Sequence, residues 1–421
     1  MSRLTMRTFL LATLCLTTWM TSGQAGDWPQ ILGPNRNGSA VQESLADKWP
    51  QAGPPSLWNR DVGSGFSGVA VVGDRGIVFH RVEDVERVEA FDVATGKTVW
   101  KADFPTSYRP AFVDDNGPRA APVIHDGKVY VFGAMGQLSC VDFAKGTKVW
   151  SRNTFKEYYS GRSRGEPAEG YFGLGSSPII EGNLVIVNVG GEEKEAGIVA
   201  FNAASGEPVW NAGAERASYS SPVAVTVGKT RHLIVETRLN TLSLDPKNGT
   251  IRWTLPFGKR GPTVNGACPT VINGHVFLTA SYGIGATFAK IHEDSAETIW
   301  TSDDVCSSQY TTCVEDGGVL YGVHGRQDVG GAALRCFDPK TQDVLWSKEN
   351  FGYATLIKAD GKLLIVTTDG QLVLAALDKT RYRELARAEV LSGTARALPA
   401  LSNGRLYLRN ERTLKCVNIG K

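Results

Sequence analysis

The chain has 421 residues, of which 42% are hydrophobic and 21% charged, and this ordinary balance excludes a wholly disordered protein. Its 47 glycines and 10 tryptophans are typical of a β protein with many tight turns. A formal net charge of +2 offers no basic excess for binding nucleic acid or an anionic membrane surface. We therefore expect a globular protein with no nucleic-acid partner.

The first 25 residues have the pattern of a secretory signal peptide. Arg3 and Arg7 precede an apolar run over residues 8–20, and small residues lead up to a cleavage point after Ala25. The run is too short to cross a membrane, and no later segment reaches the 18 apolar residues of a transmembrane helix. We expect export across the inner membrane, to the periplasm or the extracellular space.

A strand–turn–strand pattern recurs along the rest of the chain. In each copy an apolar residue and a tryptophan stand nine residues apart, and the polar turn between them usually begins with Asp or Asn. Six copies keep the tryptophan: residues 91–100, 141–150, 201–210, 244–253, 291–300 and 337–346. A seventh copy, over residues 377–386, has lost it. The pattern predicts a β-hairpin whose second strand ends on the tryptophan.

A second pattern, apolar–turn–apolar, precedes each hairpin, as in residues 121–132. Each unit therefore predicts four short antiparallel strands. The units repeat every 40 to 60 residues, which is the size of a propeller blade rather than of a helical or leucine-rich repeat.

The two ends of the chain predict how the ring closes. The eighth unit ends at Val417, four residues before the C-terminus, and so has three strands. A strand over residues 57–62 carries Trp58, the tryptophan that this unit lacks. We expect that strand to complete the eighth blade and protect its edge. The prediction is one all-β domain over residues 26–421, a single eight-bladed β-propeller of four-stranded antiparallel blades.

One tryptophan stands at the same place in seven blades. These residues are Trp58, Trp100, Trp150, Trp210, Trp253, Trp300 and Trp346. We interpret them as structural, because a large apolar ring with an N–H donor suits packing between blades. Ligand stacking is the less favoured interpretation.

The turn motif Asp-x-x-Thr-Gly-Lys-x-x-Trp, complete at residues 92–100, resembles the tryptophan-docking repeat of quinoprotein propellers, the PQQ-like repeat family. The resemblance covers almost the whole mature chain. It implies two functions. One is that of non-catalytic members such as the BamB-like proteins of outer-membrane assembly. The other is that of alcohol dehydrogenases that use pyrroloquinoline quinone (PQQ) with calcium.

The sequence lacks the features that mark the dehydrogenases. No two cysteines are adjacent, and no group of acidic residues maps onto a calcium site, which needs several converging oxygens. The six histidines lack zinc spacing, and neither a phosphate loop nor a nucleophile elbow occurs. We expect no catalytic residue, no metal and no cofactor, and favour a non-catalytic binding or scaffold protein. A PQQ-dependent alcohol-type dehydrogenase with a divergent site is the alternative.

The cysteines of the mature chain are interpreted mainly as small buried groups. Cys140, Cys336 and Cys416 each precede the apolar residue that begins a hairpin, where other blades have alanine. Cys306 and Cys313, seven residues apart at the entry to the sixth blade, are the pair considered for a disulfide.

The face on which the inner strands begin is the predicted binding face. Eight residues are expected to ring the channel mouth there: Phe66, Arg119, Gly175, Tyr219, Gly266, Tyr310, Tyr353 and Arg396. Two long inserts emerge on this face, and the second carries Tyr158, Tyr159, Arg162 and Arg164. Tyrosine and arginine are frequent at binding hot spots. We expect a monomer that binds a protein partner or a small ligand here; the alternative is that the loops only plug the channel.

Overall fold

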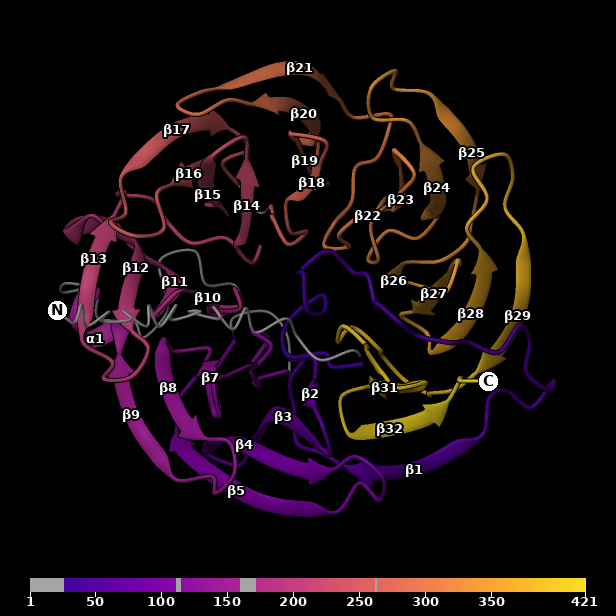
Figure 1. Cartoon of the computed structure of the whole chain (residues 1–421), viewed down its shortest axis with the longest axis horizontal. Coiled ribbons are helices and arrows are strands. Elements are labelled where there is room, and N and C mark those ends of the chain that lie inside the picture. The colour runs from indigo at the N-terminus through magenta and orange to yellow at the C-terminus, as the bar shows by residue number, and fades with distance from the viewer. Residues whose placement is uncertain (1–25, 111–114, 160–171, 262) are drawn as a thin grey trace, which may run out of the picture.

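The structure is a computed structural model, and it describes residues 26–110, 115–159, 172–261 and 263–421. It is an eight-bladed β-propeller of four-stranded antiparallel sheets, as predicted. Within each blade the first strand lies near the central channel and the fourth forms the outer rim (Figure 1). The predicted signal segment, residues 1–25, lies outside the described residues.

The first four blades hold β2 (Ala70–Val72), β3 (Arg75–Val82), β4 (Val85–Asp92) and β5 (Thr98–Pro105); β6 (Val123–His125), β7 (Lys128–Phe132), β8 (Gln137–Asp142) and β9 (Lys148–Asn153); β10 (Ile179–Glu181), β11 (Leu184–Gly191), β12 (Ala196–Asn202) and β13 (Pro208–Ala212); and β14 (Val223–Val227), β15 (Thr230–Glu236), β16 (Asn240–Leu244) and β17 (Ile251–Pro256). The helix α1 (Thr154–Tyr158) follows β9, and the 3-10 helix η1 (Glu192–Lys194) connects β11 to β12.

The next three blades hold β18 (Thr270–Ile272), β19 (His275–Ala280), β20 (Gly285–Ile291) and β21 (Ala296–Ser302); β22 (Val314–Asp316), β23 (Val319–His324), β24 (Ala333–Phe337) and β25 (Val344–Lys348); and β26 (Ala354–Ala359), β27 (Lys362–Thr367), β28 (Gln371–Ala376) and β29 (Glu384–Glu389). The eighth holds β30 (Ala400–Ser402), β31 (Arg405–Arg409), β32 (Thr413–Asn418) and β1 (Ser56–Asp61).

The eighth blade closes with the N-terminal strand, as predicted. β1 pairs antiparallel with β32, placing Trp58 opposite Cys416. The ring of Trp58 lies 5.5 Å from that of Phe91 in the first blade and 6.0 Å from that of Tyr407 in its own blade, measured between centroids. Both ends of the chain are therefore needed to complete one blade.

The apolar core lies between neighbouring blades. One cluster joins Ile77 and Phe79 of the first blade to Val129 and Val131 of the second. Both faces of a middle strand pack against apolar neighbours, so these strands read as nearly continuous hydrophobic runs. The outer strands alternate between exposed and half-buried residues because they stand at the rim.

The recurring turn motif has a direct structural cause. The Oδ1 atom of Asp92 accepts hydrogen bonds from the backbone N–H of Ala94 and of Thr95, which shapes the turn. Gly96 follows with φ +70°, a conformation that favours glycine. A Cβ atom on Gly96 would lie 2.7 Å from the indole of Trp58, so the glycine also makes room for the preceding blade's tryptophan.

The indole N–H groups tie each blade to the next. Nε1 donates to a backbone oxygen of the following blade in six cases: Trp58 to Val93, Trp100 to Phe143, Trp150 to Ala203, Trp210 to Pro246, Trp300 to Pro339 and Trp346 to Asp378. Within the described residues the indole N–H of Trp253 has no acceptor. The turn facing Trp253 has Ala296 where the first four blades have glycine.

Because the indole N–H of Trp300 has an acceptor and that of Trp253 has none in the described part of the chain, Trp→Phe should destabilise the fold more at position 300 than at position 253. Trp300 and Trp253 are 7% and 6% exposed, so Trp→Phe removes similar packing at both sites. Trp300→Phe also leaves the Pro339 oxygen without its donor at 2.7 Å, whereas Trp253→Phe removes an N–H that has no partner. We expect Trp300→Phe to lower the free energy of unfolding by about 1–2 kcal/mol more, measured in urea. Equal losses would contradict the structural role of these bonds.

The N-terminal segment, residues 26–45, has a role that the repeat pattern did not predict. Trp28 forms a bridge with Val71 of β2, and Ser39 forms one with Lys358 of β26. Leu45 forms a third bridge with Gly420. The segment thus lies across the centre of the ring, next to the inner strands (Figure 1).

Neither α1 nor η1, the two helices of the described part of the chain, is long and apolar enough to cross a membrane.

Candidate functional site

A cavity of about 370 Å³ lies at the channel mouth, on the face where the inner strands begin. Seven of the eight residues predicted there line it: Phe66, Arg119, Gly175, Tyr219, Gly266, Tyr310 and Arg396. The sequence also places a serine, threonine or cysteine just inside the mouth in several blades. The N–H of Ser177 donates to Ser221 Oγ, and that of Cys268 donates to Thr312 Oγ1, each at 2.8 Å. These bonds fix the starts of neighbouring inner strands relative to one another.

Two arginines share one aromatic ring in this cavity. The guanidinium carbons of Arg119 and Arg396 lie 5.9 Å and 5.3 Å from the ring centroid of Phe66. Arg119 also lies 5.3 Å from the ring of Phe172 and donates to the Phe172 backbone oxygen at 2.9 Å. Such contacts hold cationic groups against an apolar wall and orient them. The mouth therefore combines aromatic surface with two guanidinium groups, of which that of Arg119 also pairs with Asp115 at 3.5 Å.

The opposite wall is built by the fifth and sixth blades. Gln327 Oε1 accepts from Tyr310 Oη at 2.9 Å and from Arg396 Nε at 2.7 Å. Gln309 Nε2 donates to Tyr282 Oη at 2.7 Å. Arg396 is thus held between the ring of Phe66 and the side chain of Gln327.

The tyrosines at the mouth are hydrogen-bond donors rather than bases. Burial raises the pKa of Tyr219 and that of Tyr310 well above the usual range, so both hydroxyls keep their protons at neutral pH. Tyr219 Oη accepts from the backbone N–H of Phe172 at 3.2 Å. These groups can orient a bound partner.

The polar lining residues that the sequence did not predict include Tyr282, Gln309, Gln327 and Asp328. Tyr282, Gln327 and Asp328 lie in loops that follow a middle strand, so counting back from the inner strand does not reach them. The glycines around residues 325–331 were the available signal for the Gln327–Asp328 loop. Phe172 belongs to the second long insert, which the sequence placed on this face, and it lines the cavity.

The N-terminal segment forms the floor. Ile31 lines the cavity from below. Arg36, 5% exposed, donates from Nε to the Pro222 oxygen and from one terminal nitrogen to the Pro178 oxygen, each at 2.8 Å. Burial lowers the pKa of Arg36 to about 10, which leaves it charged at neutral pH. The side chain of Arg36 thus reaches from the N-terminal segment to backbone oxygens that immediately precede β10 and β14.

The remaining predicted site residues lie elsewhere. Tyr353 is 3% exposed and does not line the cavity; its hydroxyl accepts from the backbone N–H groups of Tyr310 and Thr311. Tyr158 and Tyr159 pack against the third blade, where Tyr159 Oη donates to the Val189 oxygen at 2.6 Å. Arg162 and Arg164 fall outside the described residues.

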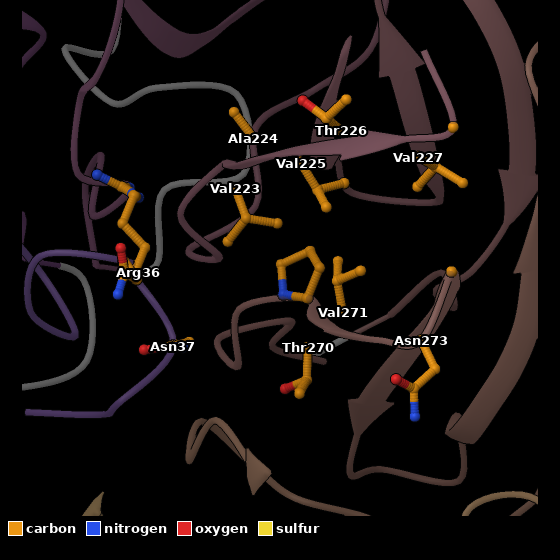
Figure 2. A pocket seen from close by; sticks show the side chains of 14 residues that line it. Arg36, Asn37, Val223, Ala224, Val225, Thr226, Val227, Thr270, Val271 and Asn273 are labelled. Carbon is orange, nitrogen blue, oxygen red and sulfur yellow. The ribbon is translucent and has the colours of Figure 1, made fainter. Parts of the chain in front are cut away.

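A second cavity, of about 450 Å³, lies between the N-terminal segment and the fourth and fifth blades. Figure 2 shows Val223 and Val225 of β14 pointing toward Val271 of β18, with Arg36 and Asn37 to one side. A more open groove of about 980 Å³ adjoins the channel mouth and shares Tyr282 with its lining. Of these three cavities, the channel mouth is the one that holds the predicted residues Tyr219, Tyr310, Arg119 and Arg396.

Among the residues that the structure describes, Glu86 and Glu236 are buried without a cationic hydrogen-bond partner. Both carboxyl oxygens of Glu236 lack a partner within the described residues, and burial raises the pKa of Glu236 well above its usual value. Glu86 accepts one bond from the N–H of Ala134 at 2.9 Å, and burial raises its pKa to about 7. Neither lines the channel mouth. In the described part of the chain no three or more His, Cys, Asp or Glu side chains come together as metal ligands.

The lining fits one part of a PQQ–calcium pair. Arg119 and Arg396 could meet carboxylates, and Phe66 offers a flat ring. Calcium requires six to eight oxygen ligands, and the described lining holds a single carboxylate, that of Asp328, which is bonded to Arg326. The lining suits the carboxylates and ring of PQQ and does not suit its calcium ion.

Sequence comparison relates the chain to quinone-dependent dehydrogenases over part of its length. The 1-butanol dehydrogenase (cytochrome c) of Thauera butanivorans is 28% identical over 195 residues, covering 44% of this chain and 26% of the relative. Quinohemoprotein alcohol dehydrogenase ADH IIB of Pseudomonas putida is 31% identical over 127 residues, covering 30% and 17%. The matched region thus spans about a quarter or less of these relatives.

Structural comparison gives the same fold. BamB from Moraxella catarrhalis matches with a TM-score of 0.63 at 16% identity, covering 87% of this chain and 98% of that one. Quinohemoprotein alcohol dehydrogenase from Comamonas testosteroni matches with a TM-score of 0.64 at 15% identity, covering 94% and 81%.

One family model matches residues 50–191 and 84–348, which together exceed half of the chain. It agrees with the docked tryptophans, the four-stranded blades and the closure described above. The chain therefore belongs to the family described as outer membrane protein assembly factor BamB, a family of PQQ-like repeat β-propellers.

Proposed function

We propose that this protein is an exported, non-catalytic binding propeller, BamB-like in mode, that engages a partner at the channel mouth. The cavity there carries the proposal. It is rigidly framed by eight blades, closed below by the N-terminal segment, and lined by aromatic rings and two arginines. Long loops on a rigid scaffold are where binding sites usually lie.

The lining chemistry indicates what such a partner presents. Phe66, Phe172 and Tyr310 offer apolar contact, while Arg119 and Arg396 offer charge next to it. An aliphatic or aromatic group next to a carboxylate would use both. Arginine and tyrosine are also the residue types that most often carry binding energy at protein interfaces.

Site-specific photocrosslinking tests the proposal. Val329 lies at the edge of the adjoining groove and is 69% exposed, so a photoreactive benzoylphenylalanine at position 329 should capture the partner of the exported protein. The same group at Val149, 44% exposed on the outer strand β9, is the matched control and should not. A partner captured equally from both positions, or from neither, would overturn the proposed binding face.

Arg396→Gln should lower the capture yield from position 329 by about thirtyfold at limiting partner, because truncating an interfacial arginine at a hot spot typically costs about 2 kcal/mol. Arg231→Gln serves as the control, since Arg231 pairs with Glu181 at an exposed site outside the lining. Loss of capture in both variants would indicate a general effect of charge rather than a role for the cavity.

The second candidate is a PQQ-dependent alcohol-type dehydrogenase with a divergent site, favoured by the matched relatives and by the arginine pair. Thermal unfolding with PQQ and calcium separates the two, because a ligand that binds only the folded state raises the midpoint. We expect no shift at saturating quinone. A rise of several degrees at micromolar PQQ, lost in Arg396→Gln, would favour the dehydrogenase.

A further inference from the structure

Two cysteines flank the loop that builds one wall of the cavity. Cys306 and Cys313 both lie in the connection between β21 and β22, which joins the fifth blade to the sixth. The six residues between them include Gln309 and Tyr310, both of which line the cavity.

The two sulfur atoms are placed to react with each other. Their separation is 4.0 Å, and the two residues are 0% and 1% exposed. Gly322 leaves the space that they occupy: a Cβ atom there would lie 2.5 Å from the sulfur of Cys313 and 2.9 Å from that of Cys306. A disulfide bond of about 2.05 Å would require each sulfur to move by about 1 Å, which side-chain rotation can provide.

We propose that Cys306 and Cys313 form a disulfide as the exported chain folds, and that this bond fixes the cavity wall carrying Gln309 and Tyr310. The reaction needs a disulfide oxidant, such as oxidised glutathione. One Cys306–Cys313 bond forms, the bond of the oxidant breaks, and the two thiol hydrogens and two electrons pass to the oxidant, which leaves as two thiols.

The burial of the two cysteines determines when during folding the disulfide can form. The contact with Cys306, together with burial, raises the pKa of the Cys313 thiol well above its usual value. A buried thiol with little thiolate exchanges slowly, so the bond must form before the blade closes over it. Once formed, it is shielded from reductants in the same way.

The wall gains a covalent constraint in addition to its hydrogen bonds. Ser308 Oγ lies 3.1 Å from Tyr353 Oη, and Tyr353 Oη also accepts from the N–H groups of Tyr310 and Thr311. The disulfide would tie both ends of this loop together and hold Tyr310 against Tyr353. The effect on binding rests on the proposed function; formation of the bond does not.

Mass spectrometry tests the bond directly. Trypsin releases residues 291–326 as one peptide, because no Lys or Arg lies between Lys290 and Arg326, and this peptide holds Cys306 and Cys313 as its two cysteines. After secretion, or after refolding with oxidised and reduced glutathione, we expect a peptide lighter by about 2 Da that resists alkylation until it is reduced. Recovery of the peptide with both thiols alkylated, from natively folded protein, would overturn the proposal.

Two variants keep the test independent of folding defects. Cys306→Ala should abolish the mass difference, whereas Cys140→Ala, at a buried cysteine in the second blade, should leave it unchanged. Reduction during refolding should lower the unfolding midpoint of the wild type by about 2–5 °C and leave that of Cys306→Ala unaffected. An equal decrease in both would assign the effect to other cysteines.

Capture from position 329 separates this proposal from the proposed function. If the disulfide forms and fixes the wall, capture should be at least about threefold stronger for the oxidised than for the reduced protein. Equal capture in both states would contradict the effect on the wall. Failure of capture in both states would refute the proposed function and leave the peptide result standing.

Discussion

Between pH 4.5 and pH 7 the wild type should lose about 3 kcal/mol of unfolding free energy relative to the variant Glu86→Gln. Glu86 lies in β4, is 2% exposed, and reaches across to the second blade, where it accepts from the N–H of Ala134. Burial raises its pKa to about 7 from an ordinary value of 4.5. Over this window the folded chain keeps the proton while the unfolded chain has lost it.

The sign follows from this retention. The contribution of Glu86 to stability is complete below pH 4.5 and is lost as the pH rises through about 7. Glutamine keeps an oxygen for the Ala134 N–H and does not titrate, so Glu86→Gln should become the more stable protein at pH 8. Denaturant unfolding at intervals from pH 4.5 to 8 measures the difference.

A matched control is available on the same hairpin. Glu83 is exposed at the turn between β3 and β4, so Glu83→Gln makes the same chemical change without altering a buried group. Parallel curves for the wild type and Glu86→Gln would show that the Glu86 carboxyl stays ionised, with water reaching it inside the fold.

The architecture could be predicted from the sequence because most blades repeat the same turn and the same docked tryptophan. The turn aspartate, the left-handed glycine and the tryptophan recur at fixed spacing, as Asp92, Gly96 and Trp100 illustrate, so the periodicity defines both strand pairs and the blade count. Closure could be predicted for the same reason, since Trp58 supplies the element that the last unit lacks.

The candidate site could be predicted only in part, because counting residues gives a position and not the direction of a side chain. Tyr310 and Tyr353 occupy equivalent positions, yet Tyr310 lines the cavity and Tyr353 turns its hydroxyl onto buried N–H groups. Tyr158 and Tyr159 lie in an insert on the expected face, but apolar contacts with the third blade hold them there.

The N-terminal segment had no periodicity from which to predict its place. Its contacts join residues far apart in the chain: Arg36 is 186 residues from Pro222 and 142 from Pro178. Such contacts depend on where eight blades bring their inner strands, and this is set only when the ring is complete. The floor of the cavity is therefore a property of the closed fold.

The second large effect is expected at this floor. Arg36→Met should lower the free energy of unfolding by about 3–5 kcal/mol, because it removes four hydrogen bonds of the guanidinium group. Two of these are the short bonds to the oxygens of Pro178 and Pro222, which lose their donor. Methionine fills a similar volume, so the loss reports the bonds rather than a void. Urea unfolding at pH 7 provides the measurement.

Two further variants decide what a loss at Arg36 means. Arg75→Met removes a half-buried arginine that donates to the Ala144 oxygen of the next blade at 3.0 Å, and should cost less than about 1 kcal/mol because water can replace that bond. Arg36→Lys keeps the charge without the planar fork and should recover less than half of the loss. If Arg36→Met cost no more than Arg75→Met, the segment would be a peripheral addition to a ring that is stable without it. A loss of the expected size would instead show that the floor of the cavity is part of the cooperative fold. The binding site and the propeller would then fold and unfold in one transition.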